Sequence, residues 1–227
     1  YHHREPHTLD LPADFDIRAL TALYYGAVTW VDDMAGRLLA ALEDNGLDRD
    51  TIVVFTSDHG DQLGSHHRWN KGTLLEESIR VPLLWRCPDR WPSAVNHQQV
   101  ASLIDIMPTV LDACGLEVPA CVQGQSLLPL LNGQRTSLER AWSFIETNAD
   151  ETEDGLATIG IRTASHLYGM RLDPQSHNLV DTEFCFYDLE RDPYELDNLA
   201  GTAHTLGIGK ELKRRLLNWH QRIPWLD

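Results

Sequence analysis

Positively charged side chains are scarce in this sequence, which holds 19 Lys and Arg against 34 Asp and Glu, for a formal net charge of -15. Binding to DNA or RNA depends on Lys and Arg that displace counterions from phosphates, so nucleic acid is excluded as a partner. The same negative field repels small anions. A site for an anionic substrate therefore needs local positive charge, from a bound metal ion or from a well-placed Lys or Arg.

Long apolar runs and clustered cysteines are also absent. No run approaches the eighteen or so apolar residues that a membrane-crossing helix needs, which excludes a membrane span. The cysteines show neither a C-x-x-C pair nor zinc-ligand spacing, and reduced, mostly buried thiols are expected. That expectation favours the cytoplasm and leaves the periplasm open. The four are Cys87, Cys114, Cys121 and Cys185.

The length of 227 residues allows one large domain, or a medium domain with a smaller appendage. The first residue is Tyr1 rather than Met, and no signal-peptide pattern follows it. We therefore expect this chain to be cut from a longer protein. Its oligomeric state stays open.

The first part of the chain alternates helical and strand-like patterns. Apolar residues recur at helical spacing over 17–43, before an Asn-Gly stop signal. The β-branched run 51–56 predicts a strand buried on both faces, and 81–85 predicts a second strand. A helix is expected over 106–113. This order predicts an α/β sandwich with a largely parallel sheet, which we place in residues 1–134.

The pattern changes after about Gly133, where short strand-like segments alternate with polar turns. A small antiparallel sheet packed against one helix is the simplest interpretation, and it defines a second domain, 135–227. The expected strands are 141–146, 157–163, 166–172 and 184–189, and the expected helix is 210–222.

Asp58 and His59 form the densest group of chemically competent residues, directly after the first predicted strand. Ligands of open α/β sheets bind outside the carboxyl ends of the strands, so both side chains are well placed to face a crevice. A carboxylate oxygen and an imidazole nitrogen can both bind a divalent cation. The alternative is a turn in which Asp58 caps a neighbouring element and His59 is merely exposed. Two ligands do not complete a coordination shell, so a metal site needs further ligands elsewhere.

Lys71 lies thirteen residues beyond Asp58, in a loop that we expect to return toward the same sheet edge. An ammonium group there can neutralise a tetrahedral anion held by a metal. The alternative is a surface lysine paired with Glu76 or Glu77.

The sequence resembles the sulfatase family of the alkaline phosphatase superfamily. The similarity covers most of the chain in family order and includes Ser-Asp-His-Gly at 57–60, Lys-Gly-Thr at 71–73 and Asp-Pro-Tyr-Glu at 192–195. The full set of matching runs is 24–32, 36–42, 51–60, 71–73, 76–83, 105–112, 124–131, 187–195 and 198–200.

The resemblance assigns roles to individual residues. It implies that Asp58 and His59 bind a divalent cation, most often Ca²⁺, with Mn²⁺ or Zn²⁺ as alternatives. It implies that Lys71 contacts the sulfate and that His66 either supports the site or faces the substrate. Arg80 is expected to bridge the neighbouring acidic pair. The implied fold is the C-terminal half of an alkaline-phosphatase-like α/β/α sandwich, followed by a small antiparallel α+β subdomain.

The family's nucleophile motif, C/S-x-P-x-R, is missing from this chain. Cys87-Pro-Asp-Arg90 has similar letters, but its Pro directly follows the Cys, so the spacing is wrong. The formylglycine that the family forms from this Cys or Ser is therefore expected in a missing N-terminal half.

The resemblance implies a metal-dependent hydrolase of sulfate esters, with a small anionic ester as substrate and the N-terminal half of the same protein as partner. The present chain alone is expected to be inactive. Two alternatives remain: a phosphonate monoester or phosphodiester hydrolase, and a catalytically inert truncated module.

Overall fold

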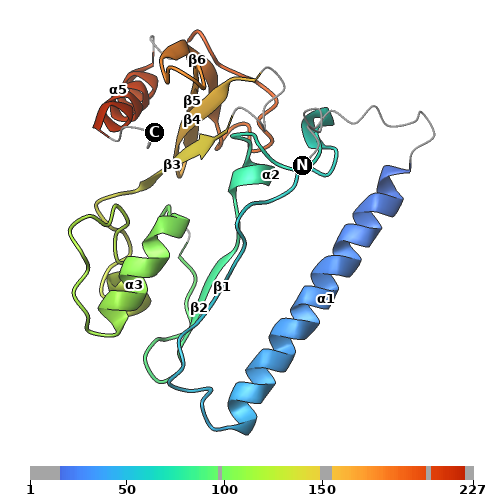
Figure 1. The fold of residues 1–227 in the computed structure, drawn as a ribbon, viewed down its shortest axis with the longest axis vertical. Coiled ribbons are helices and arrows are strands. Elements are labelled where there is room, and N and C mark those ends of the chain that lie inside the picture. The colour runs from blue at the N-terminus through green and yellow to red at the C-terminus, as the bar shows by residue number, and fades with distance from the viewer. Residues whose placement is uncertain (1–15, 97–98, 149–154, 203–205, 223–227) are drawn as a thin grey trace.

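A computed structural model describes residues 16–96, 99–148, 155–202 and 206–222 (Figure 1). The first part contains α1 (Ile17–Asp44), β1 (Val53–Thr56), α2 (Glu76–Ile79), β2 (Leu83–Arg86), α3 (Ile106–Ala113) and α4 (Leu128–Leu131). The second part contains β3 (Trp142–Thr147), β4 (Ala157–Thr163), β5 (His166–Leu172), β6 (Leu179–Asp188) and α5 (Gly207–Arg222). Every predicted helix and strand is present; about half of the boundaries shift, most by one to three residues, and β6 begins five residues earlier than expected.

Helix α1 is held at its ends by local hydrogen bonds and stands apart from the other elements (Figure 1). The Asp16 carboxylate caps its first turn by accepting from the backbone N–H of Arg18, at 3.0 Å. The helix ends where Gly46 takes a positive φ of 67°, which confirms the Asn-Gly stop. No residue of α1 is buried, and Trp30, for example, is 64% exposed. Among the described residues, no helix is long and apolar enough to cross a membrane.

Strands β1 and β2 pair antiparallel, from Val53 opposite Arg86 to Thr56 opposite Leu83. The expected parallel pairing is wrong for these two strands. Parallel neighbours usually need a long helical crossover, and the connection from 57 to 82 contains only the short 3₁₀ helix Ser65–His67 and the four-residue helix α2. The expected burial of the first strand on both faces is also wrong, because Phe55 is 41% exposed.

The second sheet is antiparallel, as predicted, and its strand order is β3-β4-β5-β6. Helix α5 covers one face, where Leu212 and Leu216 pack against Ile159, Met170 and other fully buried side chains. An amphipathic helix on a half-buried sheet explains this arrangement, because each element buries one apolar face against the other.

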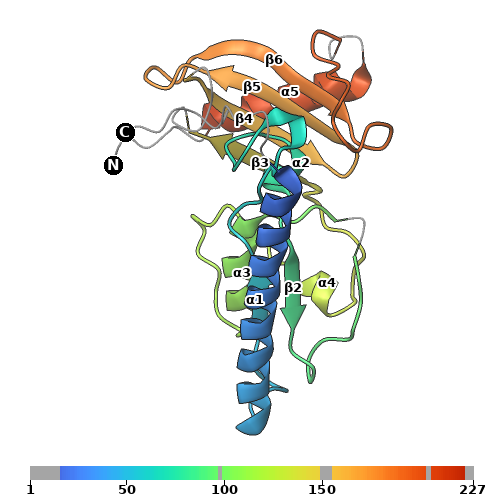
Figure 2. The ribbon, with the colours of Figure 1, turned by 90° about the vertical axis from the view of Figure 1, so that its right-hand side faces the viewer.

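The opposite face of this sheet receives a segment from the first part of the chain. Leu74 packs there with Leu167 and Cys185, and Figure 2 shows α2 lying beside the sheet. Gly160 and Gly169 are cross-strand partners, and a Cβ added to either would lie 3.0 Å or less from Leu74. The missing side chains therefore leave the space that Leu74 occupies. The predicted domain boundary near residue 134 stays a prediction, but residues 74–79 contact the sheet beyond it.

Asp105 is fully buried at the start of α3 and connects three parts of the chain. Its carboxylate accepts from the backbone N–H groups of Ser102 and Gln125, at 2.9 Å each, and pairs with Arg140. A buried carboxylate is tolerated when it is paired and hydrogen-bonded in this way. This network gives the 105–112 run a structural role.

Candidate functional site

The turn after β1 places Asp58 and His59 side by side. His59 Nε2 lies 3.5 Å from Asp58 Oδ2, so the two side chains lie close together at the end of this strand. The crevice that both were expected to face stays a prediction. Asp58 Oδ1 accepts from the His59 backbone N–H, at 2.9 Å. His59 Nδ1 lies 2.8 Å from the carbonyl oxygen of Gly60, which can only accept. In the neutral ring the proton is therefore on Nδ1, and Nε2 keeps its lone pair.

Both side chains of this pair are exposed to solvent, 83% of the Asp58 side chain and 36% of the His59 side chain. The hydrogen bond from the His59 backbone N–H, followed by the electrostatic effect of the His59 ring, holds the pKa of Asp58 below its ordinary value. An ionised carboxylate oxygen and an imidazole lone pair fit a divalent cation, and the nitrogen donor suits Mn²⁺ or Zn²⁺ better than Ca²⁺. The pair can supply two ligands of such an ion, and its role as a metal site stays a prediction.

Gly60 fixes how this turn packs. Its N–H donates to the carbonyl oxygen of Ser78, at 2.8 Å, and so joins the turn to α2. A Cβ at this position would lie 1.9 Å from the carbonyl oxygen of Glu77. Only glycine allows so close an approach between the two backbones.

The loop that carries Lys71 closes on itself and returns to this turn. The backbone N–H of Gln62 donates to the carbonyl oxygen of Asn70, at 2.8 Å, and the buried Gln62 amide donates to Thr73 Oγ1, also at 2.8 Å. These bonds hold Asn70 and Thr73, on either side of Lys71, beside Gln62. The expected position of Lys71 at the sheet edge stays a prediction. The sulfate contact assigned to Lys71 stays a prediction.

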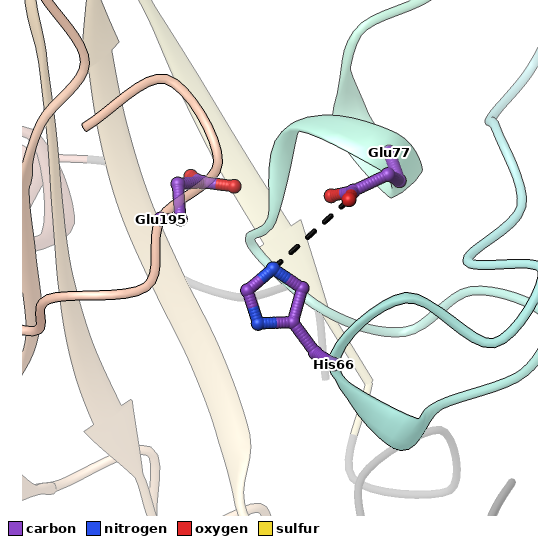
Figure 3. A group of neighbouring side chains, drawn as sticks. All are labelled: His66, Glu77 and Glu195. Carbon is purple, nitrogen blue, oxygen red and sulfur yellow. Dashed lines mark ion pairs between the residues drawn. The ribbon is translucent and has the colours of Figure 1, made fainter.

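His66 meets two carboxylates from different parts of the chain (Figure 3). Its Nε2 lies 4.0 Å from Glu77 Oε1, and the donor atoms of His66, Glu77 and Glu195 all lie within 4.8 Å of one another. Sequence reasoning assigned no chemistry to the two glutamates. The available signal was that both lie inside runs that resemble the sulfatase family. The predicted role of His66 toward a substrate stays a prediction.

Glu195 is the most buried member of this group, with 2% of its surface exposed. Its Oε2 accepts from the backbone N–H of Glu76, at 2.8 Å. Its Oε1 is buried and has no hydrogen-bond partner among the residues that the structure describes. Burial raises the pKa of Glu195 to about 7. The carboxylate is thus desolvated with only one of its two oxygens satisfied.

The neighbouring Glu76 is held by two arginines. Arg80 approaches its carboxylate to 3.7 Å, which confirms the expected bridge to the acidic pair. Arg162 of β4 makes the closer contact, at 2.9 Å. The start of α2 is therefore fixed by charge as well as by apolar packing.

Two family models match the chain, and together they span nearly all of it. The model described as Sulfatase matches residues 1–116, and the model described as N-sulphoglucosamine sulphohydrolase, C-terminal, matches residues 64–222. The chain belongs to the sulfatase family. This confirms the resemblance drawn from the sequence, and with it the alkaline-phosphatase-like α/β fold.

Individual sulfatase-family relatives show the same similarity. The chain is 32% identical over 219 residues to the multifunctional alkaline phosphatase superfamily protein PehA of Trinickia caryophylli, covering 90% of this chain and 41% of that protein. A solved sulfatase-like structure in complex with its substrate D-glucosamine-2-N,6-O-disulfate has 32% identity and a TM-score of 0.71, covering 86% of this chain and 39% of that one.

The name of a third relative indicates a different reaction, the hydrolysis of phosphonate monoesters. The phosphonate monoester hydrolase of Silicibacter pomeroyi has 30% identity and a TM-score of 0.76, covering 92% of this chain and 43% of that one. The chain spans between a third and about two fifths of the length of the curated relatives it matches.

Proposed function

We propose that this chain is the C-terminal part of a metal-dependent sulfatase that hydrolyses a small sulfate ester. The observation that supports this most is the Asp58 and His59 pair at the end of β1, with 3.5 Å between Oδ2 and Nε2 and both side chains open to solvent. Membership of the sulfatase family makes hydrolysis of an ester the expected use of such a pair.

In this proposal, Asp58 and His59 hold a divalent cation as two of its ligands. A bound cation supplies Lewis-acid charge, which polarises the oxygens of the sulfate group. Lys71 adds a second positive charge from its loop and neutralises charge that develops on the transferring group. His66 either supports the Lys71 loop from within, through its contact with Glu77, or faces the substrate. The bound cation and Lys71 supply the local positive charge that an anionic substrate needs in a protein of net charge -15.

The substrate class follows from the relatives. One solved relative binds a disulfated glucosamine as its substrate, and a sulfated amino sugar is therefore our first choice for the organic part. The roles assigned above to Asp58, His59, Lys71 and His66 concern the cation and the sulfate group and not the sugar.

A phosphonate monoester hydrolase is the second candidate, favoured by the similarity to the Silicibacter pomeroyi enzyme. Sulfate monoesters and phosphonate monoesters are both monoanions with a tetrahedral centre at neutral pH. The same cation and the same lysine can therefore stabilise either reaction, and the residues on this chain do not separate the two.

The decisive experiment uses the full-length protein that contains this chain. We expect 4-nitrophenyl sulfate to be hydrolysed with a kcat/KM at least about tenfold above that for an aryl phenylphosphonate. EDTA should abolish turnover, and parallel additions of Ca²⁺, Mn²⁺ and Zn²⁺ identify the ion that restores it. A preference for the phosphonate would establish the second candidate. No turnover of either ester, or of a sulfated glucosamine, by a folded, metal-loaded protein would establish the inert module.

A further inference from the structure

The His66 group differs from an ordinary cluster of surface charges, because its three members come from three separate segments. His66 lies on the loop after Gln62, Glu77 lies on α2, and Glu195 lies beyond β6. Figure 3 shows the imidazole nitrogen directed into the space between the two carboxylates. Backbone contacts hold these segments independently of the cluster. Its geometry is therefore imposed by the fold.

Burial makes this arrangement costly without a cation. The side chains of His66 and Glu77 are 16% and 31% exposed, and Glu195 is nearly fully buried. Two carboxylates that approach each other in a desolvated place repel, and Arg162 is engaged by Glu76 through two 2.9 Å hydrogen bonds. The buried Oε1 of Glu195 has no hydrogen-bond partner among the described residues, and a carboxylate oxygen of Glu195 lies within 4.8 Å of the donor atoms of His66 and Glu77.

We propose that His66, Glu77 and Glu195 bind a divalent transition-metal ion of the zinc class. The site uses none of the donors at the end of β1, and it does not depend on the proposed sulfatase activity. One imidazole nitrogen and two carboxylate oxygens are a ligand set that zinc accepts with water in the fourth position. Ca²⁺ and Mg²⁺ prefer oxygen donors alone, so the nitrogen argues against them.

The distances allow such an ion after a small movement. Donors around a tetrahedral zinc ion lie about 3.3 Å apart, because each bond is about 2.0 Å long. The present separations are 4.8 Å or less. The donors thus need to close by at most about 1.5 Å. His66 Nε2 and Glu77 Oε1 are already 4.0 Å apart, so this pair needs to close by only about 0.7 Å.

The neighbours of the three residues orient them for this purpose. The Glu76 N–H holds Glu195 Oε2, so that Oε1 is the oxygen left for an ion. Ser65 Oγ donates to Glu77 Oε1 and fixes that carboxylate on the same side. Partners that orient metal ligands in this way are common around zinc. The ion would fasten the Lys71 loop and α2 to the C-terminal sheet.

Zinc titration of the metal-free 227-residue chain tests the proposal. The background variant Asp58→Asn/His59→Gln removes the other candidate donors, and calorimetry with ZnCl₂ should give one site per chain. Adding His66→Gln or Glu195→Gln should weaken zinc binding at least about tenfold, whereas adding His67→Gln, at the exposed neighbour of His66, should not. Equal affinity in the His66→Gln and His67→Gln variants, or no binding by the background variant, overturns the proposal.

A second measurement leaves the three residues intact, in case a variant fails to fold. Histidine labelled with ¹⁵N reports directly on Nε2 by nuclear magnetic resonance. We expect zinc to shift the Nε2 resonance of His66 and to leave that of His67 in place, while Ca²⁺ at the same concentration shifts neither. Zinc that leaves the His66 resonance unmoved overturns the site. An equal response to Ca²⁺ overturns the assignment to the zinc class.

Discussion

Arg162 and Glu76 form a two-pronged ion pair, in which Nε and Nη2 of the arginine each lie 2.9 Å from one carboxylate oxygen. The arginine is on β4 and the glutamate on α2, so the pair joins the second sheet to the segment that follows the Lys71 loop. The two side chains are only 19% and 13% exposed. Limited access of water makes this pair stronger than an ordinary surface salt bridge.

We expect Arg162→Ala to lower the free energy of unfolding by about 3 kcal/mol, because it leaves a largely buried carboxylate with only the longer 3.7 Å contact to the exposed Arg80. Urea titration followed by circular dichroism measures the change. Arg191→Ala is the matched control, since Arg191 pairs with Asp188 at 3.6 Å while 89% exposed, and it should cost roughly 0–1 kcal/mol. Equal losses in the two variants would show that the pair contributes no more than a surface contact.

Gly169→Ala should destabilise the second sheet by about 1–3 kcal/mol, because a Cβ there would lie 2.5 Å from Leu74 Cδ1 and 2.6 Å from Cys185 Sγ. Gly36→Ala is the control, since a Cβ on that helical residue meets nothing within 4 Å. The control should be neutral or stabilising, because alanine favours a helix interior over glycine. Thermal unfolding curves of the two variants give the comparison.

Acid should remove, over a narrow pH range, the stability that an ion-pair network on the surface of α5 contributes. Hydrogen bonds from Arg214 and Arg215 lower the pKa of Glu211 from its ordinary value of 4.5 to about 2. A depressed carboxylate pKa means that the contribution to stability is present above pH 4.5 and is lost as the pH falls toward 2. We expect the melting temperature of Glu211→Gln to fall less steeply than that of the parent over this range. Because the pair is exposed, 0.5 M NaCl should reduce the difference, and a difference unaffected by salt would contradict this origin.

Lys71→Ala, made in the full-length protein, should lower kcat/KM by about a hundredfold if Lys71 neutralises charge on the transferring group. The melting temperature should stay unchanged. Lys210→Ala is the control, because Lys210 is an exposed residue of α5. Steady-state kinetics on an aryl sulfate make the measurement. Parent-like kinetics in the Lys71 variant would assign this lysine to the surface.

Helical periodicity predicted α1, α3 and α5 well, but it missed the four-residue helices α2 and α4, which are too short to show a period. The strand pairing in the first part could not be predicted. The bounds of α3 match the expected 106–113, because apolar spacing and Gly115 mark both its extent and its end. Short apolar runs such as 51–56 report burial but not direction, so the antiparallel pairing of β1 with β2 was missed. Strand β6 begins at Leu179, earlier than expected, because Asp181 and Glu183 interrupt any apolar pattern there.

The candidate site could likewise be predicted only in part from the sequence. Asp58 and His59 are adjacent in sequence and follow a recognisable strand, so their proximity could be predicted. The meeting of His66 with Glu195 depends on how the loop that carries Lys71 packs against the distant segment that follows β6. Both residues also take positive φ angles of 54°, which the side chains of His and Glu do not signal. Such contacts come from tertiary packing and leave no local pattern.

The packing of Leu74 against Gly160 and Gly169 implies an order in which these segments fold during synthesis. The ribosome releases Leu74 long before the two strands that receive it, so the loop that carries Lys71 lacks its contact with the second sheet while the chain is still short. We expect the loop to take its final place only after β4 and β5 have paired. A nascent chain that stops before β5 should therefore keep the Lys71 loop open to protease, and extension through β6 should close it.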